Sequence, residues 1–481
     1  MVDLVIKNGV VVTPRGAQLG GVAIDGGKIV AVGADSALPA ARQTVDVDGR
    51  AVLPGMIDPH THMGFTSGVR GIGEERFRSN CASESATAVL GGVTTMISTA
   101  FFGSTRESLV PCLQKAKQHV NESSIVDFKL STYPWNENHL GDLPALKREG
   151  VTSFKFCIGY EGEEAKEVGL FPVELGLVYR WMKEATRLGD PMLTMLHAEE
   201  PKLIAARKAE LKAAGRDDLA AWDEARPGVA EAMDVAKVGY IAMQLGARLY
   251  CVHQSSKESV DLIAYFKSKG VRIFGETCPQ YLILSADDPM GALAKINPPI
   301  RYAADHDRLW QGLRDGTIDN VGSDHAAVTL ESKRSHLGIW DGQPGFPGVG
   351  TLFPLLLSEG VHQGRITLEQ LVRVHSENTA RIFGIYPQKG ALLPGSDADV
   401  IVVDLDREWT IRAAGFPSAS DFTVYEGRRV KGRVEQTYVR GTLVMQDGQV
   451  TGKLGVGRYV PLSSLYGRGG SIADRAPAAS V

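Results

Sequence analysis

The chain has 481 residues, a length that predicts two to four domains unless one of them is a large α/β barrel. A formal net charge of -4 excludes the broad basic surface expected of a protein that binds nucleic acid or anionic membranes. Five cysteines without CxxC spacing, the lack of a long apolar run and an N-terminus that makes a poor signal peptide predict a cytoplasmic location.

Both ends of the chain carry short apolar runs separated by tight-turn signals. Asn-Gly, Arg-Gly and Gly-Gly pairs divide the first fifty residues, and Asp447-Gly448 is a hairpin signal among the runs that begin near residue 398. Neither end has enough strands for a stable sandwich alone. We therefore expect one β-sandwich built from residues 1–54 and 391–455. A C-terminal arm at 456–481 is expected to be partly disordered or to reach a neighbouring subunit.

Residues 55–390 differ in character, because apolar β-branched runs alternate with amphipathic stretches. Eight runs are expected to form strands, beginning near residues 56, 93, 125, 152, 192, 248, 271 and 319. Helical patterns lie between most of them, for example at 172–189 and 256–270. This alternation predicts a (β/α)8 TIM barrel. A doubly wound open sheet is the alternative, and the lack of GxGxxG after the first strand disfavours it.

Polar residues able to bind a metal ion stand at the ends of several expected strands. His60 and His62 share one face of the first strand, because residues i and i+2 of a strand point the same way. Four later strands each end in a further candidate ligand: Lys155, His197, His253 and Asp324. Because barrel active sites form at the C-terminal ends of the strands, these positions together predict a metal centre.

Lys155 lies in the otherwise apolar run TSFKFC, where an unpaired lysine is costly. It is either paired with a carboxylate or carboxylated by CO2, which would make it an anionic ligand with two oxygens. His325 follows Asp324 and is expected to point away from the metal centre as a packing or supporting residue. We interpret the remaining histidines as structural or surface groups.

The motifs around these residues resemble those of the cyclic amidohydrolases. They are HTH at 60–62, FKFCIGY at 154–160, LHAE at 196–199, VHQSS at 252–256, ETCPQYL at 276–282, NPPIR at 297–301 and GSDH at 322–325. Hydantoinases and dihydropyrimidinases look most similar, with allantoinases and dihydroorotases as relatives, and the resemblance covers nearly the whole chain. It implies a homotetramer or homodimer that acts on a small cyclic amide.

The resemblance also implies two divalent metal ions, zinc or alternatively manganese, and a role for each candidate ligand. His60 and His62 would bind the more buried ion, and His197 and His253 the more exposed one. Lys155, carboxylated on its amine, would bridge both ions.

Two further residues receive catalytic roles from the same resemblance. Asp324 would bind the buried ion and carry the proton to the leaving ring nitrogen. Tyr160 would polarise the scissile carbonyl and hold the developing oxyanion. The implied reaction is hydrolysis of a ring amide or imide by a hydroxide that bridges the metals, with a hydantoin or dihydropyrimidine as substrate.

Several positions depart from the relatives' patterns and bear on the substrate. Gly64 stands where dihydroorotases usually carry an arginine, which disfavours that activity unless Arg70 or Arg76 of the following loop substitutes. Met63 and Phe65 resemble the apolar lid of hydantoinases. Asn297 replaces a serine common in hydantoinases. Cys157 replaces a larger phenylalanine and leaves more room in the pocket. We therefore expect Met63, Phe65, Cys157, Tyr160 and Asn297 to contact a substrate with an uncharged, bulkier ring substituent.

Two segments complete this interpretation. The sequence QPGFPGVG at 343–350 replaces a Pro-Asn-Gly segment that usually contacts the imide ring. The Gly-rich stretch at 64–80 is either a lid over the substrate or an ordinary solvated loop.

Two alternatives to this function stay open at the level of the sequence. One keeps the enzyme but changes its substrate to allantoin or dihydroorotate. The other is a non-catalytic scaffold that resembles the collapsin response mediator proteins, which share the fold but have lost metal ligands. All six ligand positions are filled here, which disfavours the scaffold.

Overall fold

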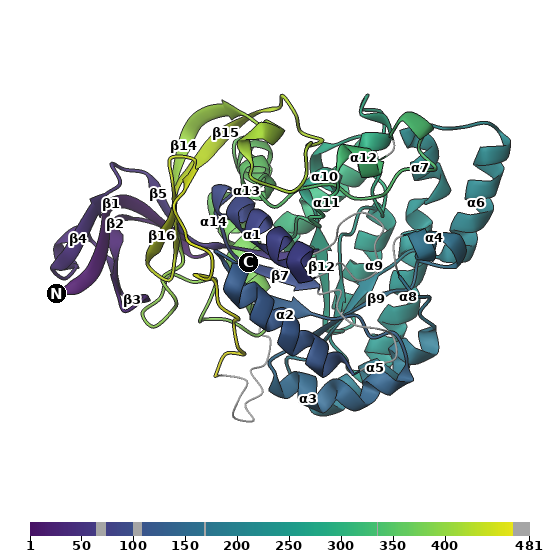
Figure 1. Ribbon diagram of the computed structural model, residues 1–481, viewed down its shortest axis with the longest axis horizontal. Helices are drawn as coiled ribbons and strands as arrows, with labels where there is room; N and C mark the ends of the chain where they lie inside the picture. The colour runs from purple at the N-terminus through teal and green to yellow at the C-terminus, as the bar shows by residue number, and fades with distance from the viewer. Residues whose placement is uncertain (64–73, 100–107, 168–169, 334, 465–481) are drawn as a thin grey trace.

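The computed structural model describes residues 1–63, 74–99, 108–167, 170–333 and 335–464. Eight parallel strands form the barrel that the sequence predicts (Figure 1). They are β6 (Met56–Thr61), β7 (Val93–Thr99), β8 (Asp127–Ser131), β9 (Ser153–Cys157), β10 (Leu193–His197), β11 (Leu249–Cys251), β12 (Ile273–Thr277) and β13 (Asn320–Val321). Thr132 pairs with Phe154 and Thr61 with His325, which closes the ring between β8 and β9 and between β13 and β6.

Every residue of β7, β8, β9 and β10 is buried, because the barrel interior covers one face and helices cover the other. The larger helices are α1 (Glu74–Leu90), α2 (Leu109–Ser123), α5 (Leu175–Leu188), α6 (Pro201–Ala213), α8 (Gly228–Leu245), α9 (Lys257–Ser268) and α11 (Ala303–Asp315). Shorter ones are α3 (Leu143–Arg148), α4 (Gly162–Glu167), α7 (Leu219–Ala225), α10 (Pro279–Ile283), α12 (Leu330–Lys333), α13 (Leu352–Leu356), α14 (Leu368–Val372) and α15 (Asn378–Ile382). The helices expected at 172–189 and 256–270 are α5 and α9.

The prediction of a loop at 64–80 is wrong for residues 74–80. Helix α1 already begins at Glu74, where Glu74 and Glu75 stand in the first turn and favour the positive end of the helix dipole. Phe77 and Cys81 then anchor the helix in the core. Residues 64–73 lie outside the described part of the chain.

A nine-stranded sheet unites the two ends of the chain beside the barrel (Figure 1). Its strands are β1 (Val2–Thr13), β2 (Gly16–Asp25), β3 (Lys28–Gly33), β4 (Ala41–Asp46), β5 (Ala51–Pro54), β14 (Val400–Thr410), β15 (Arg429–Val439), β16 (Thr442–Gln446) and β17 (Gln449–Val450). The halves meet where β5 pairs antiparallel with β14. Asp447 and Gly448 both adopt positive φ between β16 and β17, as their hairpin signal predicts. This confirms the β-sandwich built from both termini.

A buried ion network joins this sheet to the barrel. The Lys389 ammonium lies 2.7 Å from Asp399 and 3.0 Å from Asp397, and it also contacts Asp127 of β8. Arg440 contacts Asp127 through its side chain and donates its backbone N–H to Asp399 at 2.9 Å. Because the buried charges are paired, the network fixes the sheet to the barrel without leaving an isolated ion in the interior.

The described part of the C-terminal arm packs against its own barrel. The Phe128 N–H donates to the Arg458 carbonyl at 3.0 Å, and the Val460 N–H donates to the Phe128 carbonyl at 2.8 Å. These bonds occupy the edge of β8 that is not paired with β7, next to the short β8–β9 seam. Val460 is buried among residues of the barrel interior. Residues 465–481 lie outside the described part.

We expect removal of residues 457–481 to lower the thermal unfolding midpoint by about 10 °C, because it exposes the β8 edge and deletes the buried Val460. Removal of residues 465–481 alone is the matched control and should leave the midpoint nearly unchanged. Differential scanning calorimetry of both truncations measures the difference. Equal midpoints would show that residues 457–464 add nothing to the stability of the barrel.

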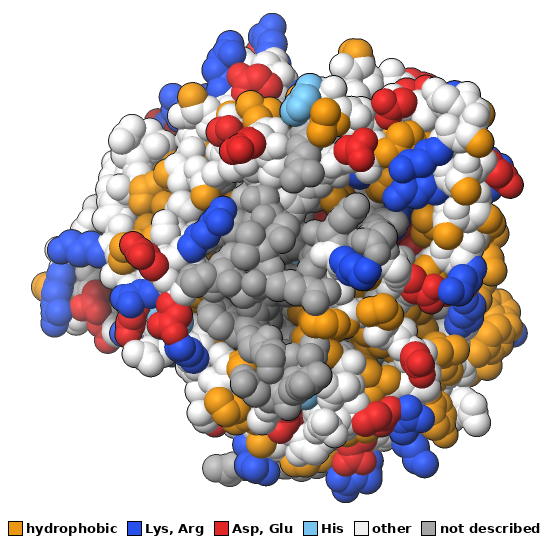
Figure 2. Space-filling view, turned by 45° about the vertical axis from the view of Figure 1, so that its right-hand side comes forward, with side chains coloured by type: hydrophobic (Ala, Val, Ile, Leu, Met, Phe, Trp, Pro, Cys, Tyr) orange, Lys and Arg blue, Asp and Glu red, His pale blue; other side chains and the backbone are white. Residues whose placement is uncertain are grey.

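The surface is mixed in charge. Acidic and basic side chains are interspersed over the face shown in Figure 2. No helix within the described ranges is long and apolar enough to span a bilayer. All five cysteines are free thiols.

Candidate active site

The structure brings all six predicted metal ligands to the C-terminal end of the barrel. His60, Lys155 and His197 lie on β6, β9 and β10, while His62, His253 and Asp324 follow the ends of β6, β11 and β13. Parallel strands end at the same rim of a barrel, so residues far apart in sequence meet there.

His60, His62 and Asp324 form one group. Their ligand atoms all lie within 4.8 Å of one another. The Asp324 carboxylate lies 3.2 Å from Nε2 of His60 and 3.1 Å from Nε2 of His62. Two imidazoles and a carboxylate are typical ligands of zinc and of several other divalent ions. The three residues therefore make a candidate site for one metal ion.

His197 and His253 form a second pair beside the first group. Nδ1 of His197 lies 2.8 Å from Nε2 of His253. Lys155 stands between His62 and His197 in the sequence. Its amine lies 2.5 Å from Nε2 of His60. Among the described residues, the recorded contact of the Lys155 amine is the His60 imidazole. It is not a carboxylate, which was one of the two alternatives at the level of the sequence.

Buried carboxylates hold the outer ring nitrogens of two of these histidines. Glu276 lies 2.7 Å from Nδ1 of His60, and Glu199 lies 2.9 Å from Nε2 of His197. Arg226 in turn donates to Glu199 at 2.7 and 2.9 Å. Such contacts fix the orientation of a metal-binding imidazole and the nitrogen it presents. The sequence analysis missed both glutamates, although they stand in the quoted motifs LHAE and ETCPQYL.

Burial favours the neutral, metal-binding form of His62 and His253. Burial lowers the pKa of His62 to about 3, with a further contribution from the charge of Lys155. Burial also places the pKa of His253 well below its ordinary value. Neutral imidazoles keep the lone pair that a metal ion requires. For Asp324, burial favours the neutral acid, but nearby His60 and the hydrogen bond from His62 outweigh it and lower the pKa.

Two ligands occupy an unusual backbone conformation. His253 has φ of 42° and Asp324 has φ of 52°, in the left-handed region that non-glycine residues rarely adopt. Both residues lie just after a strand, where the chain turns into a loop. Strain of this kind gathers at functional sites, because the surrounding structure must hold the side chain in place.

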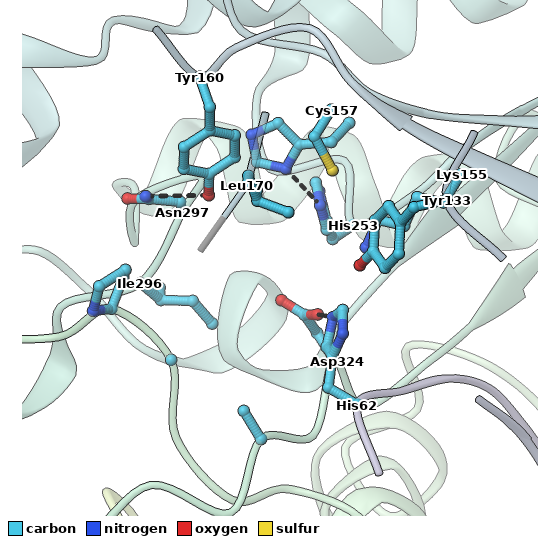
Figure 3. A pocket seen from close by; sticks show the side chains of 14 residues that line it. His62, Tyr133, Lys155, Cys157, Tyr160, Leu170, His253, Ile296, Asn297 and Asp324 are labelled. Atoms are coloured by element: carbon cyan, nitrogen blue, oxygen red, sulfur yellow. Dashed lines mark hydrogen bonds and ion pairs between the residues drawn. The ribbon is translucent and has the colours of Figure 1, made fainter. Parts of the chain in front are cut away.

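A pocket opens directly over the candidate ligands (Figure 3). Tyr160 and Asn297 lie on one side of it, and Asp324 and His62 lie on the other. The Asn297 side-chain N–H donates to the Tyr160 hydroxyl at 3.1 Å, and the Tyr160 ring packs 4.8 Å from the His197 ring. The remaining lining residues are mainly apolar or small: Tyr133, Cys157, Leu170, Ile296, Ala326, Pro344 and Gly345.

Three of the five predicted substrate contacts therefore line the pocket, namely Cys157, Tyr160 and Asn297. Met63 does not: it is 1% exposed and packs in the main hydrophobic core. Met63 lies in the turn after β6, and its side chain packs into the core on the side away from the pocket. Phe65 and Gly64 lie outside the described residues.

His325 supports the site from behind, as the sequence suggests. Its Nε2 lies 2.9 Å from the buried Glu84 of α1, and its Nδ1 accepts the Gly348 N–H at 3.0 Å. This histidine thus connects the residue after Asp324 to the 343–350 segment, whose Pro344 and Gly345 form part of the pocket wall.

The fold is a closed (β/α)8 barrel, and imidazole, lysine and carboxylate groups stand at its C-terminal rim. These features are typical of barrel proteins with a metal site. Comparison with known proteins narrows this class. The model of the Amidohydrolase family matches residues 179–444. L-hydantoinase from Paenarthrobacter aurescens is 33% identical over 467 residues, which cover 96% of this chain and 98% of the relative.

A D-phenylhydantoinase from Escherichia coli O1:K1 is 32% identical, with 95% of this chain and 97% of the relative covered. The solved structure of dihydropyrimidinase from Brevibacillus agri superposes with a TM-score of 0.87 at 30% identity, over 96% of this chain and 98% of that one. The chain belongs to the amidohydrolase family.

Proposed function

We propose that the protein is a metal-dependent hydrolase that opens a cyclic amide or imide ring of the hydantoin or dihydropyrimidine class. The observation that carries the proposal is the convergence of six ligand side chains beneath a pocket that also holds Tyr160 and Asn297. Relatives named as hydantoinases and dihydropyrimidinases, matched over nearly the whole chain, support it.

The ligand set fits two divalent ions, zinc or alternatively manganese. His60, His62 and Asp324 would hold one ion and His197 and His253 the other, with Lys155 as its carbamate placed to offer one oxygen to each. Bound there, the ions would supply Lewis acidity and lower the pKa of a coordinated water. The buried surroundings of Lys155, 3% exposed, favour a carbamate because they limit the access of bulk solvent protons, and protonation of the carbamate nitrogen is what releases CO2.

The other residues have roles that follow from their positions. The Asp324 carboxylate faces the pocket and is ionised, so it can accept a proton and return it to the leaving ring nitrogen. The Tyr160 hydroxyl can donate a hydrogen bond to the carbonyl oxygen as negative charge develops there. Asn297 donates to that hydroxyl oxygen at 3.1 Å and so helps to hold the Tyr160 side chain at the pocket wall.

The pocket wall favours an uncharged substituent on the ring. Within the described residues, the lining contains no arginine, and Leu170, Ile296, Ala326 and Pro344 present apolar surface. Among the described lining residues, none is an arginine that could pair with a carboxylate such as that of dihydroorotate. Cys157 is smaller than the phenylalanine of related hydantoinases, so the pocket has room for a bulky substituent.

A turnover screen tests the proposal. It includes hydantoin, 5-substituted hydantoins, dihydrouracil, allantoin, dihydroorotate and simple cyclic imides, with metal content measured on the same sample. We expect 5-substituted hydantoins with apolar groups to give the highest kcat/KM. A protein that binds no divalent metal even after reconstitution with bicarbonate, and opens none of these rings, would instead support the non-catalytic scaffold.

Tyr160→Phe should reduce kcat by about 10²- to 10³-fold, because the hydroxyl that stabilises the oxyanion is lost. Metal content should stay the same, since no ligand is changed. Tyr425→Phe is the matched control, because Tyr425 is also buried but lies in the loop before β15. Steady-state kinetics of both variants separate the effects, and an unchanged kcat in Tyr160→Phe would remove this tyrosine from the reaction.

We also propose a homo-oligomer, a homotetramer or homodimer, that buries the outer face of α8. This face carries four apolar side chains that are 40–51% exposed, Val229, Met233, Tyr240 and Met243, together with the exposed Lys237 and Gln244. A helix with apolar residues on both faces is usually covered on both sides. Light scattering on Met233→Lys/Tyr240→Lys should show a smaller assembly than the wild type, and an unchanged mass would place the interface elsewhere.

A further inference from the structure

A buried lysine joins two walls of the substrate pocket. Lys333, at the end of α12, is completely buried. Its ammonium donates to the Lys295 carbonyl at 2.8 Å and to the Gly345 carbonyl at 2.9 Å. Lys295 directly precedes Ile296 and Asn297, which line the pocket on one side, and Gly345 lines it on another. One side chain therefore holds both segments.

Other contacts converge on the same point. The Lys295 carbonyl also accepts the Gly345 N–H at 3.0 Å, so the two wall segments are bonded directly as well. Trp222 donates its indole N–H to the Ile296 carbonyl at 3.0 Å. The Lys295 ammonium lies 4.3 Å from the centre of the Trp222 ring. The 295–297 wall is thus held from three directions, and Lys333 is the member that reaches across to the 344–345 wall.

This arrangement is costly for the fold. The hydrogen bonds of the Lys333 ammonium that the structure records all go to carbonyls, and within the described residues no carboxylate pairs with it. Burial and the charge of Lys295 lower the pKa of Lys333 well below its ordinary value. An apolar side chain of similar length would fill the same space without the desolvation of a charge. Such a side chain would, however, remove the donor that the Lys295 and Gly345 carbonyls share, so the lysine ties these two segments together.

We propose that Lys333 is a positioning residue that sets the spacing between the Ile296–Asn297 wall and the Pro344–Gly345 wall and thereby the fit of the ring substituent. It acts through two backbone carbonyls and does not touch the substrate. The inference rests on the proposed function for its kinetic consequence, but its structural consequence is independent of any reaction.

Lys333→Met tests the inference, with Lys129→Met as the matched control. Lys129 is also completely buried and donates to one carbonyl, that of Gly150 at 2.6 Å, but it is not among the pocket residues. We expect Lys333→Met to raise KM about tenfold for a substituted ring while kcat changes less than about threefold. Lys129→Met should change neither constant.

Hydrogen exchange supplies a readout without turnover. In Lys333→Met, peptides that cover 290–300 and 340–350 should exchange at least about tenfold faster, because the carbonyls that anchor them have lost a donor. Should this variant not fold, Lys333→Gln replaces it. Its shorter amide can reach one carbonyl, and an intermediate exchange rate is expected.

The outcomes are distinguishable. If the wild type opens no ring but exchange rises in both peptides of Lys333→Met, the proposed function is wrong and the positioning role of Lys333 is supported. If the wild type turns over and neither KM nor exchange differs between Lys333→Met and Lys129→Met, the positioning role is overturned.

Discussion

Lys155→Ala should lose at least about 10³-fold in kcat/KM and most of the bound metal, because it removes the ligand that we propose is shared by both ions. The amine of Lys155 lies at the centre of the ligand cluster, 2.5 Å from Nε2 of His60, and is buried. Alanine leaves a cavity at that point. Acetate or propionate can enter it and place a carboxylate where the carbamate would be, so we expect these acids to restore part of the activity.

Two measurements make this result specific. Carbon-13 bicarbonate should give a carbamate signal in the wild-type spectrum and none in Lys155→Ala. Lys129→Ala is the control, because Lys129 is buried on the neighbouring strand β8 away from the ligands. It should keep its metal and its activity even if its unfolding midpoint falls. Full activity in Lys155→Ala would refute the assignment of a bridging ligand.

Asp324→Asn should reduce kcat by about 10³-fold or more, since the amide cannot accept and return the proton. The change preserves the shape of the side chain but removes its negative charge, which lies about equally far from His60 and His62, at 3.2 and 3.1 Å. Metal affinity at the His60–His62 site should also fall, whereas the His197–His253 pair is not altered.

Asp319→Asn is the matched control for this variant. Asp319 directly precedes β13, the strand that Asp324 follows, and it bonds Lys267 and the Gly275 N–H at 2.7 and 2.8 Å. Its loss should lower stability but leave kcat within about twofold. If Asp324→Asn retains wild-type kcat with metal bound, another group must carry the proton.

The barrel strands, and the convergence of the candidate metal ligands at their ends, could be predicted from the sequence because both leave local signals. β-branched runs with turn residues mark each strand, and His60, Lys155 and His197 stand at the ends of such runs. The closure of the barrel could not be predicted in this way. It depends on single pairs, Thr132 with Phe154 and Thr61 with His325, that leave no pattern in the sequence.

The supporting residues were missed for a related reason. The roles of Glu199, Glu276 and Lys333 depend on the groups that they contact in three dimensions. Nothing in their sequence neighbourhood distinguishes a buried charged residue from an exposed one. Met63 was misplaced although the necessary rule was available. If the strand is taken to continue past His62, the alternation that puts His60 and His62 on the same face directs Met63 to the opposite one.

The pairing of residues 458–460 with β8 has a consequence for the synthesis of the chain. During translation β8 leaves the ribosome long before Val460 is made, and β1–β5 are complete long before their partners β14–β17. The nascent chain therefore has an unpaired edge on β8 until residues 458–460 emerge, and an unpaired edge on β5 until β14 emerges. Such edges aggregate readily, so chaperones that shield exposed strands should bind the nascent chain mainly before residue 460 emerges.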